Sequence, residues 1–150
     1  MLGTDDGLSQ YPPDQVHLVN GVGYVGKKKN RQDVYRRFKE RGYTFDKVIH
    51  PTATITEGVQ VMAGAIVQVG STLGENCIIN TKVSVDHDCM VGHNVHLAPG
   101  VTVCSNVRIW QGTFVGAGSI LGNNINIGRN CFIGAGMVVG DPNDEAKLIR

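Results

Sequence analysis

The sequence has no long hydrophobic run, and this excludes a membrane-spanning helix. Within its 150 residues no stretch reaches the roughly 18 apolar residues that a span requires. The opening residues, MLGTDDGLSQ, also lack the charged and then apolar pattern of a signal peptide. We therefore expect a cytoplasmic protein without a membrane partner. A chain of this length holds one domain, or one domain with a small appendage.

An excess of either charge is also missing. Lys and Arg number 14 and Asp and Glu number 13, so the formal net charge is +1. A nucleic-acid binder gains affinity by placing a basic face on the phosphates, and no basic face is concentrated in this sequence. The charge balance therefore argues against a nucleic-acid partner. With 41% hydrophobic residues, the chain is too apolar to be disordered.

Cysteine is present but lacks the spacing of a zinc site or the density of a disulfide framework. The four cysteines are Cys77, Cys89, Cys104 and Cys131, and no two of them form a C-x-x-C pair. We expect them to be reduced and to pack as small apolar side chains. We predict no metal ligands among them.

A hexapeptide repeat occupies most of the chain. Glycine is abundant, at 20 residues, and recurs with Asn and Asp at turns, where a positive φ is tolerated. Four residues after each aliphatic repeat position comes a mostly small or β-branched residue. Because six is a multiple of two and fits poorly with 3.6, the period predicts short strands with one inward face. The aliphatic positions are Ile49, Ile55, Val61, Val67, Leu73, Ile79, Val85, Val91, Leu97, Val103, Ile109, Val115, Leu121, Ile127, Ile133 and Val139.

The repeat predicts a mainly β fold, because one hexapeptide cannot bury its aliphatic residue alone whereas stacked coils form a continuous core. We expect a parallel β-helix over residues 49–140, without a break in register or a protruding loop, and a C-terminal tail over residues 141–150. At a rung spacing of about 4.8 Å, Cys77 and Cys131 lie three rungs, or roughly 14 Å, apart. That distance is too long for a disulfide.

Residues 1–48 are expected to form a small α/β appendage. Residues 16–20 have the composition of a strand, and Asn30 is a suitable N-cap for a helix that ends at Gly42. Val34 and Phe38 lie on one face of that helix. A second strand over residues 45–49 leads into the repeat, which makes the appendage βαβ-like.

A formal G-x-G-x-x-G sequence lies between the first strand and the helix, at Gly21, Gly23 and Gly26, with Asp46 twenty residues further on. This spacing is that of a dinucleotide fingerprint. We discount it because the glycines should open the helix, whereas the lysines at 27–29 intervene. One βαβ unit is also too little for a dinucleotide fold. The lysines form a solvated charge run or help to hold an anionic ligand.

Three of the five histidines fall within ten residues, at His87, His93 and His96. His87 and His93 occupy the turn position of the hexapeptide, so their side chains should face out from the coil. His87 is flanked by Asp86 and Asp88. A carboxylate that binds one imidazole nitrogen fixes the tautomer and leaves the other nitrogen free to take a proton near neutral pH. This segment therefore has the parts of a general base and its orienting acid.

A metal-dependent, carbonic-anhydrase-like hydratase is an alternative, since three histidines can hold zinc. β-helical hydratases space two of their histidines as H-x4-H. The spacings here are six, from His87 to His93, and three, from His93 to His96. The pattern therefore fits a base better than a metal site.

The run NTKVSVDHDCMVGHNVHLAPGV, with VIHPTATI and VYRRFKERGY before it, resembles the acetyl-CoA-dependent sugar acetyltransferases. That family includes sialic-acid O-acetyltransferases and N-acetyltransferases of UDP-4-amino sugars, and the resemblance covers nearly the whole chain. It implies a left-handed β-helix of hexapeptide repeats, acetyl-CoA as co-substrate, and a sugar or nucleotide-sugar acceptor. It also implies a homotrimer with active sites between subunits. N- and O-acetylation both stay open.

The resemblance further assigns roles to individual residues. His87 corresponds to the general base, Asp88 to the acid that polarises it, and His96 to a second histidine beside the thioester. The acceptor would attack the thioester directly in a ternary complex. On later coils, turns that let a ligand lie against backbone amides supply the expected coenzyme contacts, which are Ser105, Ala117, Gly118, Ala135 and Gly136.

The sequence departs from this family at both ends. The strand and Gly-rich loop that open the relatives are missing, as is their Gly-x-Pro-Ala-Lys-like end, so we expect a relative truncated at both ends. Trp110 stands where a glycine is common. A truncated relative that serves as a non-catalytic trimeric scaffold or binding module is the alternative to an enzyme.

Overall fold

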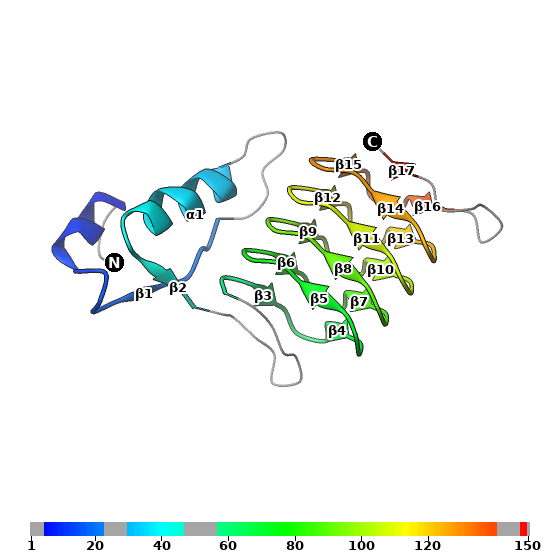
Figure 1. Ribbon diagram of the computed structural model, residues 1–150, viewed down its shortest axis with the longest axis horizontal. Coiled ribbons are helices and arrows are strands. Elements are labelled where there is room, and N and C mark those ends of the chain that lie inside the picture. Colours follow the sequence, from blue (N-terminus) through cyan, green and yellow to red (C-terminus); the bar gives the residue numbers. More distant parts are fainter. Residues whose placement is uncertain (1–4, 23–29, 47–56, 141–147, 150) are drawn as a thin grey trace. The chain divides into compact units, whose positions relative to one another are not determined.

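The computed structural model describes residues 5–22, 30–46, 57–140 and 148–149. The chain divides into two compact units, Met1–Asp46 and Lys47–Arg150 (Figure 1). The first unit contains the 3-10 helix η1 (Asp5–Gln10), strand β1 (His17–Leu18), helix α1 (Asn30–Glu40) and strand β2 (Thr44–Phe45). β1 and β2 pair in parallel, and α1 lies between them in the chain, so the expected βαβ order is present.

Helix α1 ends at a glycine cap, as its sequence predicts. Gly42 adopts a φ of 86°, and its N–H donates to the carbonyl of Lys39. The N–H of Tyr43 donates to the carbonyl of Phe38, which completes a Schellman motif. The rings of Phe38 and Tyr43 then meet edge to face at 5.7 Å. This contact joins the helix to the small aromatic core of the first unit, which also contains Tyr35 and Phe45.

The discounted dinucleotide fingerprint falls largely outside the described residues, since 23–29 are not among them. The described helix begins at Asn30, after the lysines. Its first buried residue, Arg31, donates to the carbonyls of Asn20 (2.7 Å) and Val22 (3.0 Å). The helix start is thereby tied to the chain that follows β1.

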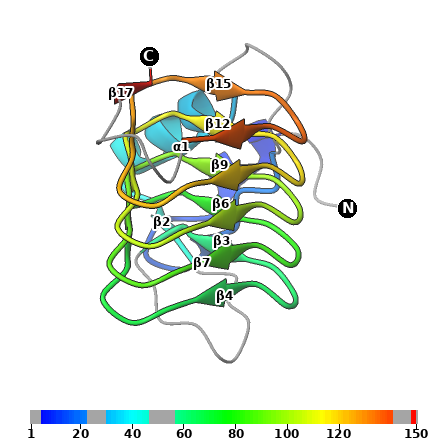
Figure 2. The same ribbon diagram turned by 90° about the vertical axis from the view of Figure 1, so that its right-hand side faces the viewer.

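The second unit is a parallel β-helix in which two-residue strands begin every six residues from Gln60 to Val138, and one more strand begins at Leu148 (Figures 1 and 2). Its strands lie on three five-stranded parallel sheets. The first sheet contains β3 (Gln60–Val61), β6 (Ile78–Ile79), β9 (His96–Leu97), β12 (Phe114–Val115) and β15 (Phe132–Ile133). The second contains β4 (Ile66–Val67), β7 (Ser84–Val85), β10 (Thr102–Val103), β13 (Ile120–Leu121) and β16 (Val138–Val139). The third contains β5 (Thr72–Leu73), β8 (Met90–Val91), β11 (Arg108–Ile109), β14 (Asn126–Ile127) and β17 (Leu148–Ile149).

The coil is left-handed. In Figure 1 the chain rises from β4 on the right, across the near side at β5, to β6 on the left, and Figure 2 places β4 and β7 on the side that Figure 1 shows at the right. A chain that turns clockwise, seen from above, as it rises forms a left-handed helix. The predicted fold class is therefore confirmed over the described repeat, while the first two repeat positions, Ile49 and Ile55, lie outside the described residues.

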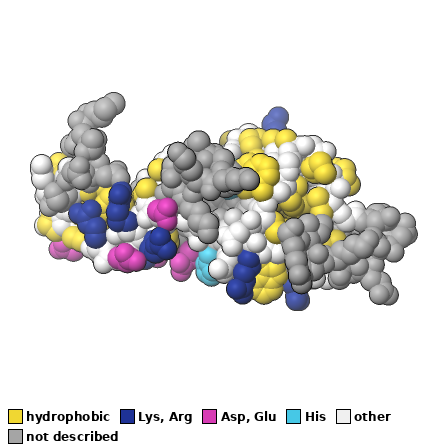
Figure 3. All heavy atoms as spheres, turned by 90° about the horizontal axis from the view of Figure 1, so that it is seen from above, with side chains coloured by type: hydrophobic (Ala, Val, Ile, Leu, Met, Phe, Trp, Pro, Cys, Tyr) yellow, Lys and Arg dark blue, Asp and Glu magenta, His cyan; other side chains and the backbone are white. Residues whose placement is uncertain are grey.

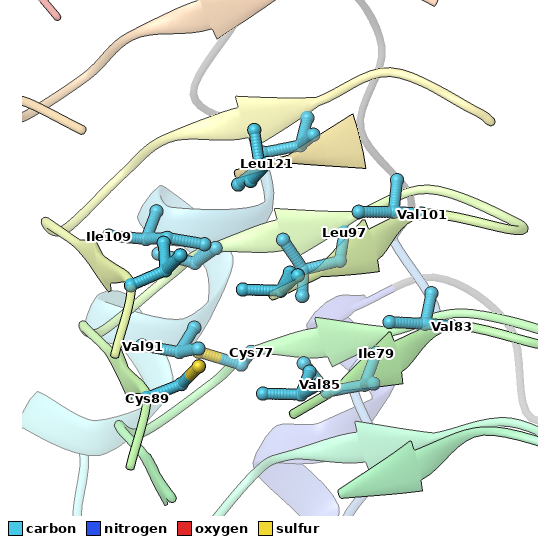
Figure 4. Packing of buried hydrophobic residues seen from close by; sticks show 14 of the residues in the cluster. Cys77, Ile79, Val83, Val85, Cys89, Val91, Leu97, Val101, Ile109 and Leu121 are labelled. Carbon is cyan, nitrogen blue, oxygen red and sulfur yellow. The ribbon is translucent and has the colours of Figure 1, made fainter. Parts of the chain in front are cut away.

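Aliphatic side chains stack in columns inside the coil because each residue pairs with the residue 18 positions further on. Ile79, for example, pairs with Leu97, and Leu97 with Val115. Ile79, Leu97 and Val115 are fully buried. Figure 4 shows Ile79 and Leu97 inside the coil together with Cys77 and Cys89. The core of the second unit is thus a continuous column, as the period predicts.

Buried hydroxyls and thiols connect successive coils. Thr113 donates to the carbonyl of Gly128 (2.8 Å) and accepts from the N–H of Cys131 (3.2 Å). Ser119 makes the same pair of bonds with Gly134 and Met137. All four cysteines are free, and three of them are buried. These positions are therefore structural, in agreement with the expectation that the cysteines are reduced.

Every corner between residues 57 and 140 has one residue with positive φ. Glycine fills this place at Gly64, Gly70 and Gly100, among others. At seven corners it is taken by a non-glycine residue, namely Asn76, Lys82, Asp88, Asn94, Asn106, Asn124 or Asn130. Asn and Asp tolerate this conformation because their short side chains bond locally. This corner geometry fixes where His87 projects, since His87 directly precedes Asp88.

Strand β17 lies within the segment expected to be a tail. It pairs in parallel with β14, with Ile149 in register with Ile127. The third sheet therefore includes residues beyond the uninterrupted repeat.

Candidate active site

The candidate site lies at one corner of the β-helix, between the second and third sheets. The first turn residues at this corner are Val69, His87, Ser105 and Asn123, which we call the His87 corner. Because they are 18 positions apart, they stand one above another on successive coils. His87 therefore faces Ser105 across a single rung.

A hydrogen-bonded group surrounds the His87 imidazole. Its Nδ1 lies 2.9 Å from Oδ2 of Asp88, and its Nε2 lies 2.9 Å from Oγ of Ser105. The Ser105 hydroxyl donates to Oδ2 of Asp86 (2.8 Å), and the backbone N–H of His87 donates to Oδ1 of Asp86 (2.8 Å). The side chains of His87 and Asp88 are 53% and 69% exposed. The predicted base and acid therefore meet on an accessible surface.

Gly70 leaves the space that the Asp88 carboxylate occupies. It lies one coil below Asp88 and has a φ of 75°. A Cβ at Gly70 would collide with Oδ1 of Asp88. Sequence reasoning missed this residue, although its position 18 before Asp88 is a signal that could have found it.

The two carboxylates act on the protonation of His87. The hydrogen bond to Asp88 raises the pKa of His87 above its ordinary value, desolvation opposes this, and the charges of Asp86 and Asp88 add to the increase. The pKa of Asp86 is lowered, first by the hydrogen bond from Ser105 and then by the N–H of His87. The site therefore stabilises an imidazolium beside two carboxylates.

The two thiols beside this network are poor nucleophiles. Burial raises the pKa of Cys89, and burial together with the charge of Asp86 raises the pKa of Cys104. A thiol reacts through its thiolate, so both groups are held in the unreactive form.

His96 is not at the His87 corner. It points outward from β9 on the first sheet, where its ring meets Phe114 edge to face at 5.1 Å. Phe114 in turn stacks on Phe132 at 5.2 Å. Within one chain, the structure therefore separates the two histidines that the resemblance brings to one site.

The remaining predicted coenzyme contacts divide between two corners. Ser105 is at the His87 corner, whereas Ala117, Gly118, Ala135 and Gly136 lie at the corner between the first and second sheets, which we call the Ala117 corner. All four residues of this group are exposed. Gly118 and Gly136 have a φ of 68°, and a Cβ on either would meet nothing within 4 Å. These glycines serve the turn and leave open space beside it.

A cavity of about 370 Å³ opens on the third sheet. Its lining includes the side chains of Met90, His93 and Trp110 and the glycines Gly74 and Gly92. A Cβ at either glycine would come within 2.8 Å of backbone atoms of the next coil, so only glycine fits. Trp110 stands in the same column as these glycines, and the Arg129 guanidinium carbon lies 5.7 Å from its ring centre.

The histidines do not gather into a metal site. His87 and His93 occupy different corners, and His96 lies on a strand. Among the described ranges no three His, Cys, Asp or Glu residues come close enough to hold an ion.

The surface charge and the helix length can be compared with what a polyanion or a membrane would require. Figure 3 shows basic and acidic side chains interspersed, without a continuous patch of either sign on the face in view. In the parts of the chain that the structure describes, no helix is long and apolar enough to cross a membrane.

The β-helix is built from hexapeptide repeats, and a known family of proteins has the same repeat. The family of bacterial transferase hexapeptides (six repeats) matches residues 70–105 and 82–117. The matched segment lies within the described coil and carries the repeat of that family.

Solved structures narrow the assignment. The acetyltransferase domain of PglB from Neisseria gonorrhoeae FA1090 is 32% identical, with a TM-score of 0.78 over 89% of this chain and 67% of that one. The same domain in complex with acetyl coenzyme A gives 31% identity and a TM-score of 0.64, over 90% and 73%. WeeI from Acinetobacter baumannii AYE shares the fold at 21% identity, with a TM-score of 0.57 over 75% and 64%. The chain belongs to the hexapeptide-repeat sugar acetyltransferases and is an acyltransferase.

Proposed function

We propose that the protein transfers the acetyl group of acetyl-CoA to an amino or hydroxyl group of a sugar or nucleotide sugar, with His87 as general base. The observation that carries this proposal is the exposed imidazole held at Nδ1 by Asp88. The PglB domain was solved with acetyl coenzyme A, which supports the co-substrate. The four free cysteines suit a reducing compartment, so we place the reaction in the cytoplasm.

The reaction proceeds by direct attack. Nε2 of His87 takes the proton of the acceptor group as its nitrogen or oxygen bonds to the thioester carbonyl carbon. The carbon–sulfur bond then breaks, and the coenzyme A sulfur leaves with a proton returned from His87. The raised pKa values of Cys89 and Cys104 argue against an acetyl-cysteine intermediate, since neither thiol is activated.

We further propose a homotrimer whose active sites lie between subunits. The second sheet separates the His87 corner from the Ala117 corner within one chain, and its outward positions carry the exposed Ile66, Ile120 and Val138. A closed ring that covers this sheet would bring the His87 corner of one copy to the Ala117 corner of the next. His96, on the adjoining first sheet, would then face the same cleft. Such a site needs residues from two copies.

The assignment is tested by measuring release of coenzyme A thiol with a panel of amino sugars and nucleotide sugars. His87→Ala should lower kcat/KM by roughly 10²–10⁴, the usual contribution of general-base catalysis. His93→Ala, at the equivalent turn position of the next corner, is the matched control and should retain the rate. An unchanged rate in His87→Ala would remove the assignment.

Two further measurements complete this test. Direct attack predicts no burst of free coenzyme A in the absence of an acceptor. Calorimetry with acetyl-CoA separates the enzyme from the scaffold alternative, because a scaffold would show no binding.

A further inference from the structure

The Ser105 hydroxyl bridges the base and a second carboxylate. Its Oγ lies 2.9 Å from Nε2 of His87 and 2.8 Å from Oδ2 of Asp86, and it donates to Asp86. Asp86 accepts because a carboxyl is ionised near neutral pH, and the bond from Ser105 lowers its pKa further. A hydroxyl has a single proton, so Ser105 can accept from Nε2 but cannot also donate to it. Nε2 must therefore carry a proton to complete this contact.

The other ring nitrogen has the same requirement. Nδ1 lies 2.9 Å from a carboxylate oxygen of Asp88, which is an acceptor when ionised. All three contacts are satisfied together only when the imidazole carries both protons. A neutral ring protonated at Nε2 would leave the Nδ1 lone pair facing the Asp88 carboxylate. A neutral ring protonated at Nδ1 would leave the Nε2 lone pair facing the serine oxygen, or would take the serine proton away from Asp86.

The backbone fixes Ser105 in this position. The N–H of Ser105 donates to Oδ1 of Asn123 on the coil above (3.1 Å), and the N–H of Asn106 donates to the carbonyl of His87 (3.1 Å). The rungs on both sides therefore hold the hydroxyl opposite the ring.

We infer that Ser105 is a positioning residue of the acetyltransferase site, whose hydroxyl joins Asp86 to Nε2 of His87 and stabilises the imidazolium formed when His87 takes the acceptor's proton. This inference rests on the proposed function. An acceptor that presents its proton to Nε2 displaces the serine from the ring, while the serine keeps its bond to Asp86. After the transfer, the new N–H can donate back to Ser105. The sequence predicts a coenzyme contact at Ser105, and the hydrogen bonds add a role for its hydroxyl beside the base.

The charged groups that act on His87 are few. Asp86 and Asp88 act from its own corner. At the same corner Val69 lies one coil below, and Ser105 and then Asn123 lie above, all uncharged. Cys104 beside Ser105 stays protonated because its pKa is raised. A change at Ser105 should therefore be visible in the titration of His87.

The experiment follows the His87 ring protons by NMR across pH in the wild type, Ser105→Ala and Ser105→Thr. Ser105→Ala should lower the pKa of His87 and move the acid limb of kcat/KM to lower pH. Its plateau should fall roughly tenfold to a hundredfold, the effect of one hydrogen bond to a charged group. Ser105→Thr should restore both, and Gln111→Ala, at the same turn position of the corner between the third and first sheets, should change neither.

An unchanged or increased pKa of His87 in Ser105→Ala would overturn the inference, as would a lower plateau without movement of the acid limb. Asp86→Asn provides a second test. If Asp86 acts through the serine, the effects of the two substitutions on the pKa of His87 will not add. A shifted titration in a protein without transferase activity would preserve the hydrogen-bond link and reject the proposed function, so the two failures are distinguishable.

Discussion

At the scale of single residues, the pairing of His87 with Asp88 sets the pH response of the site. The hydrogen bond to Asp88 is the largest cause of the raised pKa of His87. A general base works in its neutral form, so kcat/KM should decline on the acid side as pH falls through a pKa above the ordinary value of 6.5.

Asp88→Asn should therefore lower the pKa of His87 and extend activity toward lower pH, while the plateau falls because the imidazolium loses its carboxylate partner. The pH profile of kcat/KM measures both effects. Asp33→Asn, on the exposed surface of α1, serves as the charge control. An acid limb that stays in place would contradict the role of Asp88.

The same pKa shift has a small consequence for folding. Because the folded state raises the pKa of His87, protonation favours that state. The contribution is fully present below the unfolded pKa of 6.5 and is lost as pH rises through the folded pKa.

At the scale of strands and turns, buried hydroxyls replace part of the backbone ladder. Thr113 is buried and bonds the carbonyl of Gly128 and the N–H of Cys131. Thr113→Val keeps the volume but leaves these two groups without the hydroxyl, so we expect a loss of about 1–3 kcal/mol in the free energy of unfolding. Urea denaturation measures it.

Thr72→Val provides the matched control, because Thr72 is exposed on β5 of the third sheet, away from the sheet that the proposed trimer covers. That change should stay within about 0.5 kcal/mol. Equal effects of the two substitutions would show that the buried bonds of Thr113 contribute nothing.

The sequence predicted these elements well wherever the period of six continues. The inward positions are buried because an aliphatic side chain at each sixth residue has no other favourable place, and the turns follow from Gly and Asn. Strand β17 was not predicted, because Ile149 comes ten residues after Val139 and so falls off the six-residue count. The six-residue period predicts strands only where the repeat is uninterrupted.

The candidate site was predicted less completely. Asp88 follows His87 directly in the chain, so their pairing could be expected from proximity. The bond between Ser105 and His87 depends on which way two side chains turn across a rung, and sequence does not show this. The separation of His96 from His87 follows from their spacing of nine, which is not a multiple of 18.

At the scale of the whole molecule, the proposed trimer makes a test by mixing possible. His87→Ala and His96→Ala should each be inactive alone. If every site combines His87 of one copy with His96 of the next, randomly mixed trimers should regain about a quarter of the wild-type activity, since half the copies supply each intact residue.

The measurement is coenzyme A release after the two variants are unfolded together and refolded, with each variant refolded alone as control. No recovery in mixtures that do form trimers would reject a cleft that combines His87 of one copy with His96 of the next.

The 18-residue register also governs which changes of chain length this protein can tolerate. Deleting 18 residues would remove one turn of the β-helix and leave every later residue at the same corner or strand position. Deleting six residues between Asp88 and Cys104 would preserve the alternation that fills the core, yet would rotate the later chain by one side of the triangle. Gln111 would then stand over His87 in place of Ser105. Insertions or deletions of six residues should therefore preserve the fold, whereas only those of eighteen residues should also preserve the site.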